Sequence, residues 1–368
     1  VGTAAGDAVM RKLWILLMLL WCVVPVYGAE LPEELTDAIP DSARELLDVA
    51  DKENDFTSLN KGLSGLWDRT CKLLATTVQD SLGGVILILS AILLCSVAED
   101  CFGAAEEGKI LDPVPLAGIL VILLAVGSNM KNLMGLGEET IAELNVFSKA
   151  LLPTLSAATA AGGGAVSASV RQVATVFFSD VLMSLINSLL LPLVWVFVAL
   201  SAADAILPAG RLGGIAGGVQ KAITWLLSGS LILFTGYLSL SGAFASSADS
   251  LTLRMTRSAI GGAIPVVGGI ISDAADTVLA GAGVMRQSIG VVGTLTILAT
   301  CILPFLKLGV QYLLLKLSAF FAATVAPTPL VKLVDSLSTA FGLVLGMTGA
   351  AALLLLISVA SSVMAVSV

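Results

Sequence analysis

Two aspartates that follow a glycine-rich apolar run are the residues of this chain whose type and spacing most suggest chemistry. Asp273 and Asp276 come directly after the run 265–271 and lie on one side of an expected helix. Carboxylates are costly inside a bilayer and usually line a polar path, so the pair is a candidate for conducting ions or protons. The alternative is structural, with Asp273 as the N-cap of a helix and Asp276 at its third position. The two interpretations are compatible, and both stay open.

Three further residues are candidates for a functional role beside this pair. Arg286 could form an ion pair with Asp273 or Asp276, or it could contact lipid headgroups as the other arginines are expected to do. Pro153 and Pro265 interrupt apolar segments and are candidate gating positions. A broken helix at membrane depth has to be covered by other helices or by a wet cavity, which is where a gate would form.

The rest of the sequence offers no equipment for catalysis. The chain has no histidine, which removes Ser-His-Asp and Cys-His nucleophile systems and histidine-based metal sites. None of the five cysteines forms a CxxC pair. Gly213 and Gly218 have the spacing of a phosphate loop, but Val219 stands where its lysine should be. The sequence therefore predicts no catalytic residue, metal, cofactor or nucleotide, and it argues against an enzyme.

The elements that must position these residues are apolar helices. Hydrophobic residues make up 57% of the 368 residues and charged residues only 12%, against about 25% charged in a soluble domain. The mean hydropathy is +0.99. We expect an all-α polytopic integral membrane protein with about 7–9 transmembrane or re-entrant helices. The expected apolar segments are 82–98, 113–130, 141–161, 173–203, 222–245, 259–271, 288–306, 308–326 and 341–365.

The N-terminal part of the chain has a different character. Residues 1–28 have the layout of a signal peptide, since Arg11 and Lys12 precede the apolar run 13–24 and Gly28 ends a small-residue site. An uncleaved anchor is the alternative. Residues 29–78 then form an extracytoplasmic amphipathic helical segment, expected on the membrane surface or against a partner. Residues 29–80 hold twelve acidic and five basic residues, so this segment will not bind nucleic acid by charge.

A spacing of 112 residues recurs in the remaining chain. It separates Pro153 from Pro265 and Pro192 from Pro304. We therefore divide the membrane region into a first hairpin, 79–140, and two repeats, 141–252 and 253–368. Paired broken segments in duplicated halves are typical of transporters and channels. Chance similarity between low-diversity apolar sequences is the alternative.

The run 253–278, LRMTRSAIGGAIPVVGGIISDAADTV, resembles the most recognisable part of the stage III sporulation protein AE family. Shorter runs at 162–168, 289–293 and 316–319 and the step Leu191-Pro192 are also similar, in the same order and spacing over about residues 80–365. The resemblance implies an endospore former and a place in the mother-cell membrane around the forespore. It implies partners, namely other subunits of the stage III sporulation channel complex, and it supplies no catalytic or ligand-binding residues.

Three functional hypotheses follow. The first is a membrane component of this complex, linking mother cell and forespore as a gate or export platform. The second is an ion-coupled transporter with duplicated halves, and the third is a non-transporting membrane scaffold. The first expects other subunits and the lipid bilayer as partners, and neither nucleic acid nor nucleotide.

Overall fold

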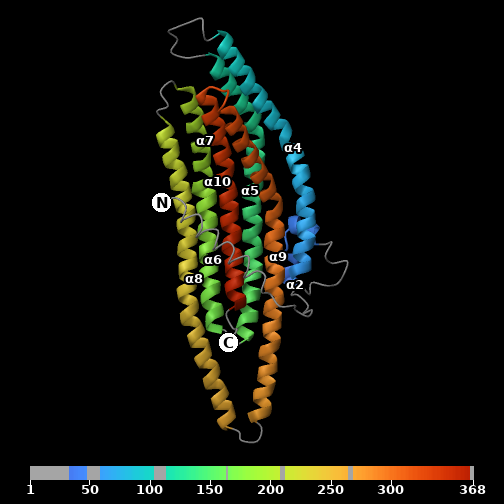
Figure 1. The fold of residues 1–368 in the computed structure, drawn as a ribbon. Coiled ribbons are helices and arrows are strands. Elements are labelled where there is room, and N and C mark those ends of the chain that lie inside the picture. The colour runs from blue at the N-terminus through green and yellow to red at the C-terminus, as the bar shows by residue number, and fades with distance from the viewer. Residues whose placement is uncertain are drawn as a thin grey trace.

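The computed structural model describes residues 33–47, 59–102, 113–162, 165–207, 212–263 and 268–364. The elements are α2 (Glu33–Asp37), α3 (Asp41–Leu47), α4 (Leu59–Phe102), α5 (Pro113–Ala161), α6 (Ala165–Leu185), the π-helix η3 (Ile186–Leu190), α7 (Leu191–Ile206), α8 (Gly213–Ala263), α9 (Gly268–Ala322) and α10 (Thr328–Met364). No strand occurs in these ranges. The long helices run side by side along one direction (Figure 1). The signal peptide expected at 1–28 and Pro265 lie outside the described residues.

Six helices of the described chain are long and apolar enough to cross a membrane, which confirms an all-α polytopic membrane protein. Their candidate spans are Thr70–Glu99, Val114–Ala161, Gln172–Ile206, Gly213–Leu240, Gly281–Ala322 and Thr328–Val363. The expected segments 113–130 and 141–161 form one helix, α5, and most of 288–306 and 308–326 forms α9. No proline stands between them, and most of the residues there, such as Lys131 and Lys307, are good helix formers, so the helix continues despite Gly135 and Gly137.

One proline and one aspartate lie at other positions in their helices than the sequence predicts. Pro153 was expected to interrupt an apolar segment, but it lies within α5, which continues through it to Ala161. The helix α9 begins at Gly268, so Asp273 lies in its second turn and is not its N-cap. The helix thus includes Gly268 and Gly269 in its first turn, although glycine is a poor helix former. The division points 79, 141 and 253 fall inside α4, α5 and α8.

The helices α9 and α10 form the centre of the bundle. In the most apolar window of each helix, 67% of α9 and 56% of α10 is buried, against 22% for α4 and 17% for α8. Small residues allow close packing around this pair. A Cβ atom on Gly293 of α9 would lie 2.8 Å from Cδ1 of Leu151 on α5, and one on Gly118 of α5 would lie 2.6 Å from Sγ of Cys95 on α4. These contacts hold α5 between α4 and α9.

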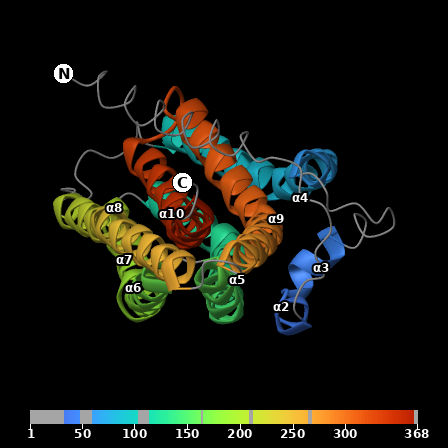
Figure 2. The same cartoon turned by 90° about the horizontal axis from the view of Figure 1, so that it is seen from below.

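The short N-terminal helices pack against this bundle. Leu35 of α2 and Ala43 of α3 are fully buried, and Ala43 contacts Leu295 and Ala299 of α9. The hydroxyl of Ser42 donates a hydrogen bond of 2.7 Å to Oε2 of Glu143 on α5. Seen along the bundle, α2 and α3 lie on the side of α5 and α9, away from α6–α8 (Figure 2). Of the apolar side chains expected to face a membrane surface or a partner, Ala43 is thus covered by the same chain.

Polar contacts between the long helices fix their register. Lys149 of α5 and Asp180 of α6 approach to 4.0 Å, and both side chains are about half exposed. Lys316 of α9 donates a hydrogen bond to Asp335 of α10. At surface positions such pairs contribute little to stability, but among apolar helices they fix which faces meet.

The buried hydroxyl pair between α6 and α10 provides a test of this packing. Thr175 and Ser358 are 0% and 1% exposed, and their hydroxyl oxygens lie 2.6 Å apart. Changing Thr175→Val should lower the free energy of unfolding in detergent micelles by about 1–2 kcal/mol, because the Ser358 hydroxyl is left without a partner. Adding Ser358→Ala should recover part of that loss, since both polar groups are then gone. Strictly additive effects of the two changes would contradict the contact.

Candidate functional site: a polar groove between three helices

Three apolar helices carry short polar stripes at helical spacing. Thr77, Asp80 and Ser81 share one face of α4, since residues three and four apart are neighbours on a helix. Lys307 and Gln311 share a face of α9 in the same way. The stripe on α5 consists of Asn129, Asn132 and Glu139.

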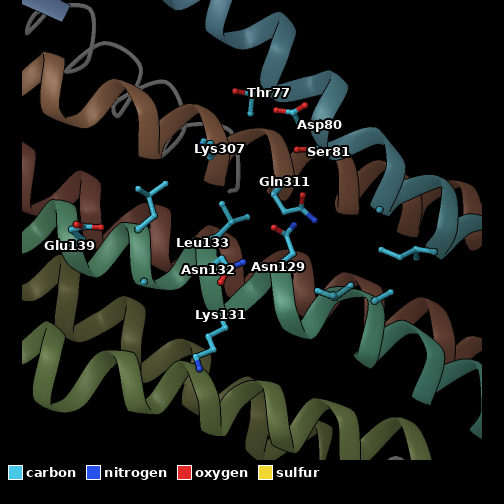
Figure 3. A pocket seen from close by; sticks show the side chains of 16 residues that line it. Thr77, Asp80, Ser81, Asn129, Lys131, Asn132, Leu133, Glu139, Lys307 and Gln311 are labelled. Carbon is cyan, nitrogen blue, oxygen red and sulfur yellow. The ribbon is translucent and has the colours of Figure 1, made fainter. Parts of the chain in front are cut away.

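The three stripes line one cavity of about 780 Å³ between α4, α5 and α9, which we call the polar groove (Figure 3). Its lining also contains Lys131, whose side chain points away from the centre of the groove, and the glycines Gly84 and Gly135. A Cβ atom on either glycine would have no neighbour within 4 Å, so the groove is open at both positions. The groove is therefore hydrophilic and large enough for several water molecules or a small solute.

The most telling side chain of the groove is Gln311. It is 3% exposed, and its Oε1 has no hydrogen-bond partner in the described chain. Gln311 and Asn129 point toward one another across the middle of the groove (Figure 3). An unpaired buried amide oxygen is costly in apolar surroundings, so its position favours an occupant that donates a hydrogen bond.

Charges of both signs surround this amide. Lys307 is partly buried, and Asp80 and Glu139 are exposed on the other two helices. None of these three side chains forms an ion pair within the described chain. Ionisable residues on apolar membrane helices are costly and usually serve a function, and here they converge on one cavity. The arrangement can solvate a charged or polar solute, and it contains no nucleophile paired with a base.

The residues that the sequence singled out lie elsewhere. Asp273 and Asp276 are in the first turns of α9, where α8 and α9 project beyond the ends of α5 and α10 (Figure 1). Their side chains are outside the described residues, so the pairing with Arg286 stays a prediction. Arg286 is 9% exposed and its Nε has no hydrogen-bond partner in the described chain. Pro153 is exposed on α5. None of these described residues lines the groove.

The groove could not be predicted from the sequence, because Lys307 was expected to lie between two separate spans. A signal was present in the spacing. Lys307 and Gln311 are four apart, and Asn129 and Asn132 are three apart, which puts each pair on one helix face. Nothing local indicates that these faces meet, since α5 and α9 are far apart in the sequence.

Comparison with known proteins gives a consistent result. The sequence model of the family described as stage III sporulation protein AE matches residues 44–366. The curated stage III sporulation protein AE of Bacillus subtilis (strain 168) is 25% identical over 257 residues. That match covers 70% of this chain and 64% of the relative, so the chain spans somewhat less than two thirds of its length. No solved structure matches.

Proposed function

Because the chain belongs to the stage III sporulation protein AE family, we propose that it is the gate-forming membrane subunit of a channel complex that links mother cell and forespore. The family makes it a sporulation protein, and the six apolar helices found among its described residues make it a membrane protein. In the proposal the polar groove lines the passage, and solutes move along it without chemical change, so the chain is not an enzyme.

One observation carries the gating part of the proposal. Among the described helices, the polar groove joins Lys307 and Gln311 of the central helix α9 to stripes on α4 and α5. A scaffold needs apolar contact faces but no cavity with charged residues inside an apolar bundle. A hydrophilic cavity with an unpaired amide is what a passage for polar solutes requires.

The proposal also assigns a place and partners. The chain lies in the mother-cell membrane around the forespore, with residues 29–78 on the extracytoplasmic side. Its partners are other membrane subunits of the same sporulation complex. The large exposed apolar side chains of α4 and α8, such as Leu94 (71%) and Trp225 (75%), leave surface for lipid and for those subunits.

Extraction from sporulating cells tests the assembly. An affinity-tagged chain, solubilised in mild detergent, should co-purify with other sporulation membrane proteins in a fixed ratio, identified by mass spectrometry. A tagged chain from vegetative cells that express it alone is the control, and it should not bring down the same set. Recovery of the chain alone from sporulating cells would contradict a complex and favour a self-sufficient transporter.

A further inference from the structure

The polar stripe of α9 does not end at the polar groove. Thr300 and Thr296 continue it beyond Lys307, and Arg286 lies further along the same side. With 100° per residue, the five residues from Arg286 to Gln311 fall within a sector of about 80° of the helix. Thr296 and Thr300 are 0% and 2% exposed, so this continuation is buried.

Unpaired polar atoms recur along the stripe. Oγ1 of Thr296 and Nε of Arg286 lack hydrogen-bond partners in the described chain, as Oε1 of Gln311 does. Buried polar groups in proteins are nearly always satisfied, by water when not by protein. Three such atoms on one side of the most buried helix mark a line along which polar groups lack partners within the described chain.

The helix α5 carries a matching stripe. Glu143 follows Glu139 four residues later, on the face that Asn132 and Glu139 turn to the groove. The helices α5 and α9 pack closely beyond the groove, as the contact between Gly293 and Leu151 shows. We call the line between the two stripes, from Gln311 to Arg286, the polar seam.

The short helices α2 and α3 bridge the two sides of the polar seam. On the α9 side Ala43 packs against Leu295 and Ala299, and on the α5 side Ser42 donates its hydrogen bond to Glu143. Leu35 of α2 is buried in the main core. The polar groove is open where α2 and α3 are absent. The polar seam is buried where these two helices bridge it.

We propose that the polar seam continues the polar groove as a single hydrophilic pathway for water and small polar solutes, and that α2–α3 is a plug that closes it. The hydrogen bond from Ser42 to Glu143 holds the plug in its closed position. When the plug leaves, Thr296, Thr300 and Glu143 become accessible from the groove. The proposal rests on the proposed function in taking the groove as a passage, and it adds the route and the closing element.

Cysteine accessibility tests the plug. In a chain whose five native cysteines are replaced, Thr300→Cys is treated with a charged, membrane-impermeant methanethiosulfonate reagent. It should react slowly with the plug intact. Adding Ser42→Ala should raise the rate about fivefold, the change expected when one ordinary hydrogen bond no longer holds the closed state. Adding Ala43→Glu should raise it further, since a buried carboxylate drives α3 off α9.

Two control positions make the result decisive. Asn132→Cys in the open groove should react equally fast in every background. Ile223→Cys, 0% exposed on α8, a helix that lines neither the groove nor the seam, should stay unreactive throughout. If Ala43→Glu exposes Ile223→Cys, the fold has loosened and the Ser42→Ala background alone decides.

Two outcomes would overturn the proposal. If Thr300→Cys stays unreactive in both plug variants while Asn132→Cys reacts, the seam is a closed core. If Thr300→Cys reacts fast with the plug intact, α2–α3 does not close it. These rates are measured in isolated membranes and need no spores, so their failure is distinguishable from a failure of the proposed sporulation role.

Discussion

Replacing Gly84 by tryptophan should reduce heat-resistant spores to the level of a strain that lacks the chain. Gly84 lines the polar groove from α4, and a Cβ atom there meets no atom within 4 Å, so the indole would project into the cavity. Tryptophan also suits a helix better than glycine, so α4 itself gains stability. The measurement is the titre of heat-resistant spores in a strain whose own copy is replaced, with the amount of chain in membranes as the reference.

The neighbouring glycine provides a matched control for this substitution. Gly83 also has no neighbour within 4 Å of a Cβ position, but it does not line the groove. Gly83→Trp introduces the same side chain into the same helix turn and should leave sporulation close to normal. Equal titres for the two variants would mean that the groove is not a passage.

Changing Lys307→Met should have an effect nearly as large. The methionine keeps the length and helix propensity of the side chain and removes the charge that faces the polar groove. A charge held on the central helix of an apolar bundle is costly, and removing it should stabilise the folded chain. We expect fewer heat-resistant spores together with an unchanged or higher thermal midpoint in detergent, a combination that separates a functional from a structural role.

Two further variants serve as controls for Lys307→Met. Lys307→Arg keeps the positive charge and should restore most spores. Lys221→Met removes an exposed lysine from α8, which does not line the groove, and it should sporulate normally. If Lys221→Met is as defective as Lys307→Met, the defect arises from membrane topology or net charge and the groove assignment is wrong.

The fold class could be predicted from the sequence because it depends on composition and local hydropathy. The segment 173–203 coincides closely with the candidate span Gln172–Ile206 for this reason, and 222–245 lies within the longer helix α8. The prediction was wrong where a polar residue suggested a loop, as at Lys307. Hydropathy indicates which side chains are costly to place in lipid, but it does not indicate where a helix ends. The backbone stays helical past a polar residue unless glycine, proline or a capping residue interrupts it.

The candidate site was harder to predict because it depends on contacts across the sequence. Gln311 and Asn129 come from different helices, and Ser42 and Glu143 are 101 residues apart. Helical spacing identifies which side chains share a face but not which faces meet. Asp273 and Asp276 drew attention through their local pattern, whereas the residues of the groove are spread over three ordinary apolar helices.

The length of α5 has a consequence for how the chain sits in a membrane. Its 49 residues extend about 73 Å along the helix axis, at about 1.5 Å per residue. The hydrocarbon layer of a bilayer is about 30 Å thick, so one membrane accommodates less than half of this rod. The remainder must stand in water or among neighbouring subunits. A molecule of this reach is suited to span the narrow gap that separates two closely apposed bilayers.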